Sequence, residues 1–378
     1  MTFVLSEDQQ MLRDTAISFA RDELPVSHLR GLRDSGANGV DEASRQKLAE
    51  LGFFGVLVPE EFGGVDMGMI AMGQVMEAQG RTLAATSLLQ TAVLGASTIA
   101  LGGSQALKSE WLPKIASGEV TTALAVDEST HHAPLNVATE AERNGEGYTL
   151  NGAKRFVAAG HHADVFIVAA RTFGEPGQAH GISLFLVPKE ASGLSVQALD
   201  TVDSHGAAHL TFEDVAVPET NVIGAVDAGW DVLEPALDRG RIALSAEMLG
   251  SAQAAFEMTL DYLQTRKQFG QLIGSYQSLQ HRAAKMYTDL ELVRSCVGAA
   301  LSAVDDQTDQ VAELASVAKT LASELIHLVS NEAVQMHGGI GMTDEHDSGL
   351  YMKRARVQEA MLGGATYHRD RFGRIKGF

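Results

Sequence analysis

The sequence changes character twice along its length, and these two changes constrain the fold more than any single motif does. Between about residues 120 and 220, short β-branched runs such as Val165–Val168 and Ile182–Val187 are punctuated by glycines, which predicts a small β domain. On both sides apolar residues recur with helical spacing, and after Gly229 these periodic stretches are long. We therefore predict an α+β chain of three domains: helical over 1–118, β over 119–225 and helical over 226–378.

The expected helices have recognisable ends. Ser6 and Gln9 form a capping-box pattern, so a first helix should start there and end near Pro25. A later helix should begin just after QMHGGIG, with Thr343 or Asp344 as its N-cap. In the C-terminal domain the periodicity predicts helices over about 228–264, 274–304, 308–337 and 344–361, and a short last helix from about 366.

Composition excludes several classes of function. The 378 residues are 45% hydrophobic and 20% charged, as in soluble globular proteins. A net charge of −19 argues against binding nucleic acid or an anionic membrane, because both require basic surface. No stretch of about 18 residues is continuously apolar, and the N-terminus lacks a signal-peptide pattern. The single cysteine, Cys296, cannot form an intrachain disulfide, which fits the cytoplasm. With no long apolar stretch, we expect no membrane span.

Two segments of the C-terminal domain carry more than helical periodicity requires. Residues 264–281 read LQTRKQFGQLIGSYQSLQ and place Arg266 beside Phe269 and Gly270, where a long helix should break. Residues 335–341 read QMHGGIG and place a glycine pair at another helix end. Glycine lets backbone amides approach a ligand and arginine binds phosphate well, so the two segments suit the pyrophosphate of a dinucleotide. The alternative is two helix ends with ordinary glycine caps.

Together with these two segments, the layout resembles the acyl-CoA dehydrogenase family over nearly the whole chain. Supporting segments are FVLSEDQQMLR near the start, VPEEFGG from residue 58, GYTLNGAK from residue 147 and FEDVAVP from residue 212. The resemblance implies an N-terminal helical domain, a small middle β-barrel or sandwich and a C-terminal four-helix bundle. It also implies an FAD enzyme, assembled as a homo-oligomer or as an α2β2 heterotetramer with a paralogous subunit, that passes electrons to an electron-transfer flavoprotein.

The resemblance implies a reaction as well. In the family, the flavin takes a hydride from the β carbon of an acyl-CoA thioester while a carboxylate removes an α proton, which gives a trans-2-enoyl-CoA. The α proton is too weakly acidic for a side chain to remove unaided. Hydrogen bonds to the thioester carbonyl must therefore stabilise the enolate-like charge.

The family's contacts with FAD can be carried over to this chain by position. The matching residues are Arg266, Gln268 and Phe269 for the adenosine diphosphate part across a subunit interface, and Gln335, Gly338 and Gly339 for the pyrophosphate. In the middle domain the usual Thr-Glu-Pro and Gly-Ser-Asp are replaced by DESTHHAP from residue 127, where Ser129 is expected to restore part of the lost hydrogen bonding. Phe156 and Ala158 stand where the family has tryptophan and threonine, and Thr366 is expected near the flavin from the turn before the last helix.

The catalytic base is the main departure from the family pattern. The two usual positions are empty of carboxylates, because one falls in Met361–Thr366 and the other on Gly240, just before Arg241, which we take as a substrate-binding residue. Glu247 lies seven residues, nearly two helical turns, beyond Gly240 and therefore faces the same way, about 10 Å further along the axis. Its apolar neighbours indicate that it is either buried or on a narrow polar stripe, and burial would suit a general base. The alternative is a structural glutamate paired with Arg241 or with a partner's residue.

The resemblance favours Glu247, because a branch of short, heteromeric members that act on bulky thioesters, including steroid side chains, carries a glutamate at this position. We therefore predict FAD-dependent dehydrogenation of an acyl-CoA, with a bulky or steroid side-chain acyl group as the favoured substrate. Two alternatives remain open: a flavin-poor or non-catalytic subunit of a heteromeric dehydrogenase, and other flavin chemistry such as desulfination or nitroalkane oxidation.

Three further polar groups receive structural interpretations from the sequence. The histidine pairs at 131–132 and 161–162 lack the spacing of metal ligands and are predicted to be solvated loop residues, so no metal site is expected. Glu77 and Arg81 are four residues apart in a predicted helix and are expected to pair with each other on its surface. Cys296 is expected in the core.

Overall fold

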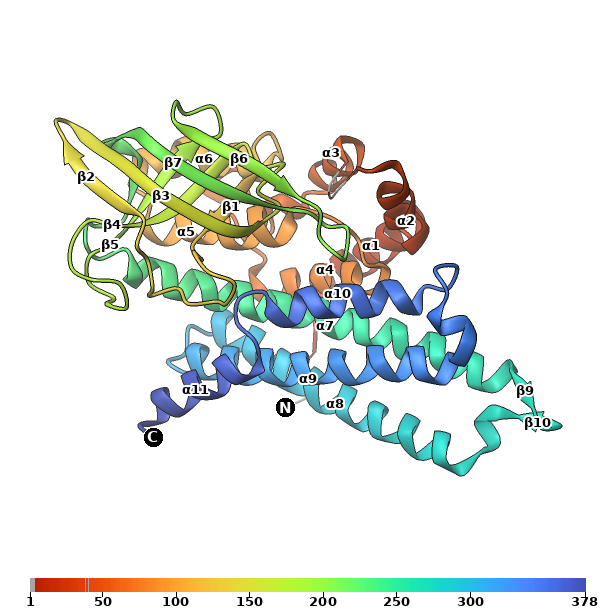
Figure 1. Cartoon of the computed structure of the whole chain (residues 1–378). Helices are drawn as coiled ribbons and strands as arrows, with labels where there is room; N and C mark the ends of the chain where they lie inside the picture. The colour runs from red at the N-terminus through yellow and green to blue at the C-terminus, as the bar shows by residue number, and fades with distance from the viewer. Residues whose placement is uncertain (1–3, 38, 40) are drawn as a thin grey trace. The chain divides into compact units, whose positions relative to one another are not determined.

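The computed structural model of the protein describes residues 4–37, 39 and 41–378 (Figure 1). By its internal contacts the chain divides into two compact units. The helical unit comprises Met1–Gly31, Met69–Ala84 and Arg241–Phe378, and the mixed unit comprises Leu32–Gly68 and Ala85–Gly240. Along the chain the predicted order of helical, β and helical segments is confirmed.

A β-sheet forms the centre of the mixed unit. Its strands are β1 (Thr122–Ala125), β2 (Glu140–Asn144), β3 (Gly147–Ala158), β4 (Val165–Arg171), β5 (Ile182–Pro188), β6 (Leu194–Leu199), β7 (Ala207–Pro218) and β8 (Val222–Ile223). In the described residues they run in the order β6-β7-β3-β2-β4-β5-β8, and β1 pairs in parallel with β4. β4 and β5 are buried almost throughout, as their continuous apolar runs require. The strands predicted around 165–168, 182–187 and 210–217 are confirmed.

A break in the register of β3 positions the loop that follows β1. β3 pairs with β7, and the pairing shifts between Lys154 and Val157. The shift takes the Arg155 amide out of the sheet, so that it donates to the carbonyl of Asp127 at 2.8 Å. Phe156 follows with a left-handed φ of +50°. Such bulges re-aim side chains beside functional sites, and this one joins the two mixed-unit segments that the sequence places near a flavin.

Helices complete the mixed unit. They are α3 (Glu42–Glu50), α5 (Ala96–Gly102), α6 (Gln105–Ala116), the π-helix η3 (Leu89–Gly95) and the 3-10 turns η1 (Phe53–Gly55), η2 (Glu60–Phe62) and η4 (Glu219–Asn221), while α2 (Val26–Ser35) belongs to both units. η3 is buried over its whole length. No helix in the described residues is long and apolar enough to cross a membrane.

Long helices build the other unit. They are α1 (Glu7–Glu23), α4 (Gly68–Thr82), α7 (Trp230–Thr265, which begins in the mixed unit), α8 (Gln277–Asp305), α9 (Val311–His337), α10 (Ser348–Ala360) and α11 (Ala365–Lys376). β9 (Lys267–Gln268) and β10 (Gln271–Leu272) form a hairpin that extends beyond the ends of α7 and α8 (Figure 1), with η5 (Ile273–Ser275) behind it and η6 (Gly338–Met342) after α9. The predicted C-terminal helices are confirmed to within four residues at their starts and ends.

The helix caps give one confirmation and one correction. Ser6 and Gln9 form the predicted capping box at the start of α1. The predicted cap of α10 by Thr343 or Asp344 is wrong, because α10 begins only at Ser348 and its N-cap residue, Asp347, makes no side-chain cap. Asp347 is instead held by Arg30, whose Nη2 lies 2.6 Å from its Oδ1. The expected place of Cys296 in the core also fails, since its side chain is only half-buried.

α4 and α7 cross at two glycines, and this crossing fixes the backbone around Glu247. A Cβ added to Gly80 would lie 1.9 Å from the carbonyl oxygen of Glu247, and one added to Gly250 would lie 2.0 Å from that of Glu77. Ser251 Oγ donates across the crossing to the Gly80 carbonyl at 3.0 Å. Gly250 therefore serves close helix packing rather than a roomy pocket.

Candidate active site

The two segments of the predicted dinucleotide site lie on neighbouring helix ends. Tyr262, in the last turns of α7, stacks against His337 at the end of α9 with ring centroids 4.5 Å apart. His346 packs on His337 at 4.2 Å. His337 is buried and bonds through Nδ1 to the carbonyl of Ala333 at 2.7 Å, and its burial lowers its pKa. These stacked rings hold the glycine turn η6 against the base of the hairpin.

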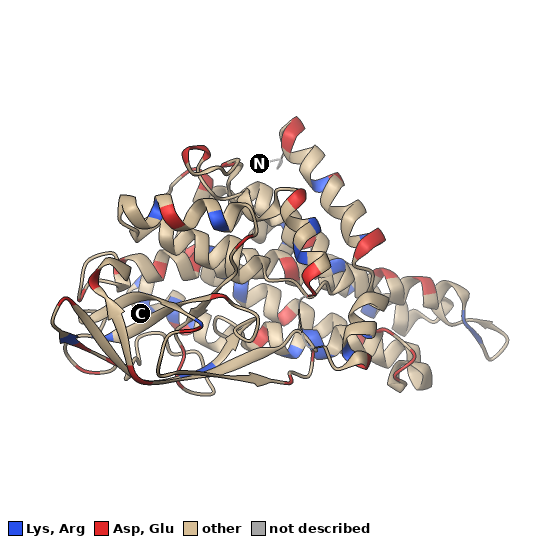
Figure 2. Cartoon of the chain, turned by 90° about the horizontal axis from the view of Figure 1, so that it is seen from above, with Lys and Arg blue, Asp and Glu red and all other residues tan. Residues whose placement is uncertain are grey.

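The hairpin presents its functional candidates to the outside of this chain. Phe269 has a φ of +52° and is 93% exposed, while Gly270 follows at +81°. Arg266 and Gln268 are exposed as well. The segment from Arg266 to Ser275 contains no acidic residue, and Figure 2 shows basic colouring without red in the projecting hairpin. An exposed aromatic and a basic strand of this kind are suited to contact a group held outside the chain's own core.

The glycine turn leaves its backbone accessible. Gly338 has a φ of +62°, and a Cβ added to Gly338 or Gly339 would meet nothing within 4 Å. Both glycines and Gln335 are exposed. Open backbone next to a helix end can approach phosphate oxygens closely, so the residues present fit the pyrophosphate of FAD.

In the mixed unit a buried ion pair supports the loop after β1. Lys154 is fully buried, and its Nζ donates to Glu128 Oε1 at 2.6 Å and to the Val126 carbonyl at 3.1 Å. Burial lowers the pKa of Lys154 despite this partner. Burial alone would raise the pKa of Glu128, but Lys154 and the amide of Thr139 hold it below its usual value.

The same loop contains a second pair. His132 Nδ1 lies 2.8 Å from Asp127 Oδ2, and its side chain is only 3% exposed. The prediction that His132 is a solvated loop residue is therefore wrong, because Asp127 draws the ring inward. Ser129, by contrast, is exposed and its Oγ donates to the His131 carbonyl at 2.9 Å. In the described residues no group of three or more His, Cys, Asp or Glu side chains could hold a metal ion.

Phe156 stands at the bulge of β3 close to this loop. Its ring is 55% exposed and packs edge-on against His209, with centroids 5.0 Å apart. Its amide donates to His209 Nδ1 at 3.2 Å. The aromatic surface is thus turned outward from the mixed unit, while Thr366 lies exposed in the first turn of α11 in the helical unit.

Of the two placements that its apolar neighbours allow, Glu247 is buried, and it is hydrogen-bonded to α10. Its Oε1 accepts from Arg354 Nη2 at 2.5 Å and Nε at 3.1 Å, and from Gln358 Nε2 at 2.9 Å. All hydrogen bonds described for this carboxylate end on Oε1, and the residue is 6% exposed. The basic neighbour is therefore Arg354, not Arg241 as the structural alternative had suggested.

Arg241 lies under the turn that joins α10 to α11. Its Nε lies 3.4 Å from the Leu362 carbonyl, its Nη2 3.3 Å from the Tyr367 hydroxyl, and its guanidinium packs over the Tyr367 ring. His368 Nε2 bonds to the same Leu362 carbonyl at 3.0 Å, and burial lowers the pKa of His368 to about 2, so the ring is neutral. The structure thus shows Arg241 in contact with protein groups, and its role with substrate stays a prediction.

The backbone of this turn excludes a carboxylate at Gly363. Gly363 has a φ of +99°, and an added Cβ would lie 2.5 Å from the Tyr367 ring. Gly364, the next residue, has room for a side chain, since its nearest neighbour is the Glu359 carbonyl at 3.6 Å. The packing of the turn therefore excludes a side chain at Gly363 only, and the absence of a carboxylate at Gly364 is a matter of sequence.

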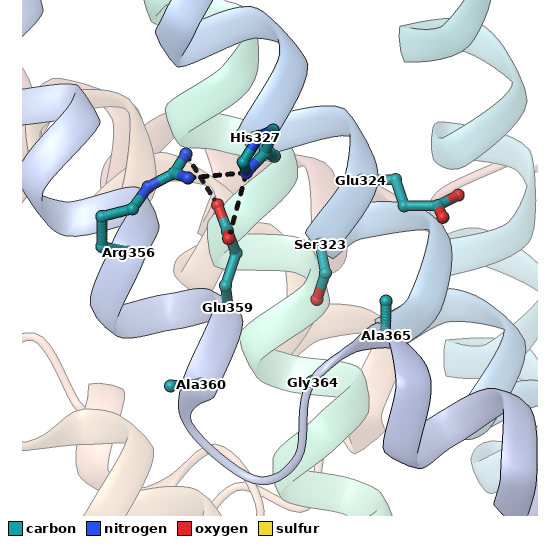
Figure 3. A pocket seen from close by; sticks show the side chains of 8 residues that line it. All are labelled: Ser323, Glu324, His327, Arg356, Glu359, Ala360, Gly364 and Ala365. Atoms are coloured by element: carbon teal, nitrogen blue, oxygen red, sulfur yellow. Dashed lines mark hydrogen bonds and ion pairs between the residues drawn. The ribbon is translucent and has the colours of Figure 1, made fainter.

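A pocket of about 560 Å³ opens beside the turn (Figure 3). His327 on α9 points toward Glu359 and Arg356 on α10, and Arg356 Nη2 lies 2.8 Å from Glu359 Oε1 (Figure 3). Ser323 and Glu324 face the pocket from α9. Its lining therefore combines both signs of charge with one hydroxyl group.

Glu77 and Arg81 do not pair with each other as predicted. Glu77 Oε1 binds Arg294 of α8 at 2.8 Å, and Arg81 binds Glu257 of α7 at 2.5 Å. Gln253 bridges the two pairs, because its amide bonds both Glu257 and Arg294. The network ties α4 to α7 and α8, so both residues serve the helix packing around Glu247.

Sequence reasoning missed the polar residues that surround Glu247 and the turn. These are Lys319, Arg354, Gln358 and His368, all buried. The available signal was weak: Lys319 is a lone charge in the apolar run SVAKTLAS, and Arg354 is one of several basic residues in MKRARVQ. Neither pattern says which distant residue the side chain will meet.

Comparison with known proteins agrees with this fold. The family models for the N-terminal, middle and C-terminal domains of acyl-CoA dehydrogenases match residues 6–119, 123–215 and 227–375. The chain is 33% identical to cyclohex-1-ene-1-carbonyl-CoA dehydrogenase of Geobacter metallireducens, over 95% of each chain. It is 32% identical to mitochondrial isovaleryl-CoA dehydrogenase of Pongo abelii, over 98% of this chain and 89% of that protein.

Solved structures agree equally well. Butyryl-CoA dehydrogenase of Megasphaera elsdenii superposes with a TM-score of 0.91 at 28% identity, covering 100% of both chains. The ChsE4–ChsE5 complex of Mycobacterium tuberculosis gives 0.91 at 29% identity over 100% of both chains, and the Tcur3481–Tcur3483 steroid ACAD gives 0.88 at 30% over 98% of both. The chain therefore belongs to the acyl-CoA dehydrogenase family. It is an oxidoreductase that acts on the CH–CH group of acyl-CoA.

Proposed function

We propose that the protein binds FAD and converts an acyl-CoA with a bulky or cyclic acyl group to its trans-2-enoyl-CoA, with Glu247 as the base that takes the α proton. The observation that carries this proposal is the oriented, buried carboxylate of Glu247 in a family member whose usual base positions hold no carboxylate. A general base must be held in one geometry. Arg354 and Gln358 anchor Oε1, and we assign the α proton to Oε2.

The residues that would hold FAD are those whose surroundings suit it. The open backbone of Gly338 and Gly339, together with Gln335, would take the pyrophosphate, and the exposed Arg266, Gln268 and Phe269 would reach the adenosine diphosphate part bound by another copy. Ser129, Phe156 and Thr366 are proposed as contacts of the flavin part. When bound, FAD supplies the acceptor for the hydride from the β carbon. The protein's own task is to orient the thioester and to remove its α proton.

The nature of the acyl group is inferred from relatives. The Tcur3481–Tcur3483 protein is described as a steroid ACAD, and the Geobacter relative is named for a cyclic acyl group. We infer a bulky or cyclic substrate and an electron-transfer flavoprotein as the electron acceptor. A panel of butyryl-, isovaleryl-, cyclohex-1-ene-1-carbonyl- and steroid side-chain CoA thioesters, read by bleaching of the flavin, tests this inference. Fastest bleaching with the straight-chain thioester would contradict it.

The decisive variant is Glu247→Gln, which preserves the shape of the side chain and can still hydrogen-bond Gln358. Loss of a general base typically costs 10²–10⁴-fold in rate, so we expect turnover to fall by that amount while thioester binding and FAD content persist. Near-normal turnover would reject Glu247 as the base. A variant that unfolds would instead indicate that the pair with Arg354 is structural.

Arg266→Ala should lower FAD content in the assembled protein, with Arg374→Ala, an exposed arginine of α11, as the control.

A second candidate is a subunit that supports a partner without catalysing the reaction itself. It is favoured by the absence of a carboxylate at both usual base positions and by the similarity to the ChsE4–ChsE5 complex, an assembly of two components. This alternative predicts that the chain purified alone is colourless and stays colourless with added FAD. Full FAD occupancy in the chain alone, with bleaching by an acyl-CoA, would exclude it.

A further inference from the structure

We propose that Lys319 is a positioning residue for Glu247 and that it acts through Gln358. The proposal rests on the proposed function, because it takes Glu247 as the base. Lys319 lies on another helix, α9, 72 positions after Glu247 in the sequence. Its ammonium group orders the end of α10 and, through it, the side chain of Gln358 that holds Glu247.

Lys319 is fully buried, and every hydrogen-bond acceptor described for it is neutral. Its Nζ lies 3.0 Å from the Gln358 carbonyl, 3.2 Å from that of Glu359 and 3.0 Å from that of Gly363. Ser323 Oγ is the fourth acceptor, at 3.2 Å. The last turn of a helix leaves carbonyls without intrahelical donors, and here one ammonium group caps them from a neighbouring helix.

Gln358 transmits this capping to the base. Its carbonyl is fixed by Lys319, while its side chain points to α7 and donates through Nε2 to Glu247 Oε1 at 2.9 Å. The residue is fully buried, and Nε2 also lies 3.5 Å from Ser251 Oγ. Because packed interiors do not deform freely, movement of the Gln358 backbone must move the amide that holds Oε1.

The ammonium can lose its proton within the physiological pH range. Burial lowers the pKa of Lys319 to about 7; the Glu359 carboxylate opposes this and Arg241 adds to it. These two groups face Lys319 from α10 and α7, and the neutral imidazole of His368 faces it from α11. An amine has two N–H donors for four acceptors, so above this pH the cap is incomplete.

A route for that proton is present in the structure. Ser323, which accepts from Lys319, also lines the pocket of about 560 Å³ beside the turn (Figure 3). One hydroxyl group therefore separates the buried ammonium from the pocket. Proton exchange at Lys319 does not require the helices to open.

The test uses the full FAD-loaded protein and the acyl-CoA of the panel that bleaches its flavin fastest. We expect kcat of the wild type to fall as pH rises through about 7, with KM changing less. Misplacing a catalytic group by about 1 Å can cost about 100-fold, so Lys319→Met should lower kcat by roughly ten- to a hundredfold at pH 6.5 and remove this pH dependence. Lys285→Met, on the exposed face of α8, is the matched control and should change neither.

Two further variants separate positioning from general damage. Gln358→Ala keeps the backbone carbonyls that accept from Lys319, so the variant should stay folded. It should nevertheless lower kcat and abolish the dependence of kcat on pH near 7. In a Glu247→Gln background, Lys319→Met should cause no further loss of rate. Independently of activity, hydrogen exchange of the peptide covering 356–367 should rise in Lys319→Met and not in Lys285→Met.

Each outcome of these experiments supports or contradicts the positioning role of Lys319. A pH dependence that persists in Gln358→Ala, or an equal rate loss from Lys319→Met with and without Glu247, would overturn the positioning role while leaving Glu247 as the base. Near-normal turnover of Glu247→Gln alone would remove the base itself and the proposal with it. If Lys319→Met does not fold, the pH profile of Gln358→Ala decides.

Discussion

The protein contains two fully buried lysines, and they are accommodated in opposite ways. Lys154, in the mixed unit, meets the carboxylate of Glu128 at 2.6 Å. Lys319, in the helical unit, meets three backbone carbonyls and a hydroxyl group. The first arrangement neutralises the charge and ties a loop to a strand. The second leaves the charge without a carboxylate hydrogen bond, and burial lowers the pKa of Lys319 to about 7. The comparison therefore separates a buried cation held by a carboxylate from one held only by neutral acceptors.

The largest effect is expected when the ion pair is broken. Glu128→Ala leaves Lys154 buried without its carboxylate, and such a loss typically costs about 3–5 kcal/mol. Urea unfolding monitored by circular dichroism measures the change, with Glu142→Ala on the exposed edge of β2 as the control. A loss no greater than that of the control would mean that the Val126 carbonyl alone satisfies Lys154, and the contrast between the two lysines would disappear.

The second test concerns the sign of the pH dependence at Lys319. Its pKa is about 7 in the folded protein against 10.5 for an ordinary lysine, so the unfolded chain binds more protons between these two values. Folding then releases a proton, and the stability contributed by Lys319 rises with pH from about 7 to 10.5 and is lowest below pH 7. The stability of the wild type relative to Lys319→Met should therefore increase by a few kcal/mol across this window, at about 1.4 kcal/mol per pKa unit.

This second prediction is checked by urea midpoints of the two proteins at pH 6, 7.5 and 9. Subtracting the variant removes groups that titrate in both proteins. A constant difference between them would show that Lys319 keeps its proton throughout this range. The structural distinction from Lys154 would then have no energetic consequence.

The two lysines also show what sequence can and cannot predict. The helix break at Phe269 and the helix end at Gly338 follow from local chemistry, since each has a left-handed backbone, and both were predicted. The hairpin between the two helices was not predicted. For Glu247 the apolar neighbours left two placements open, burial or a narrow polar stripe, and the structure shows burial. Its partners were not predicted, since Arg354 and Gln358 lie 107 and 111 residues away.

The turn from Met361 to Gly364 shows more clearly what could not be predicted from the sequence. The sequence showed that no carboxylate is present there, but not that Gly363 is blocked by the Tyr367 ring while Gly364 has room for a side chain. The sequence also did not predict that Lys319 would cap the end of α10, because every residue has a backbone carbonyl and none marks itself in the sequence as an acceptor. His132 was misjudged for a related reason: Asp127 is close in sequence, but only the bend of the loop turns the ring toward it.

The smallest effect is expected for Asp127, which extends the comparison from the two buried lysines to a carboxylate of the mixed unit. Burial alone would raise the pKa of Asp127, but His132 and the amide of Ala133 hold it below its usual value. The carboxylate therefore contributes stability above pH 4 that is lost as pH falls through its folded pKa. Asp127→Asn should cost about 1.5–3 kcal/mol at pH 6, as expected for hydrogen bonds to a charged group, and the cost should shrink as the pH falls through the folded pKa of Asp127. A cost that persists in acid would mean that Asp127 acts by shape. In that case the response to pH would belong to the helical unit alone.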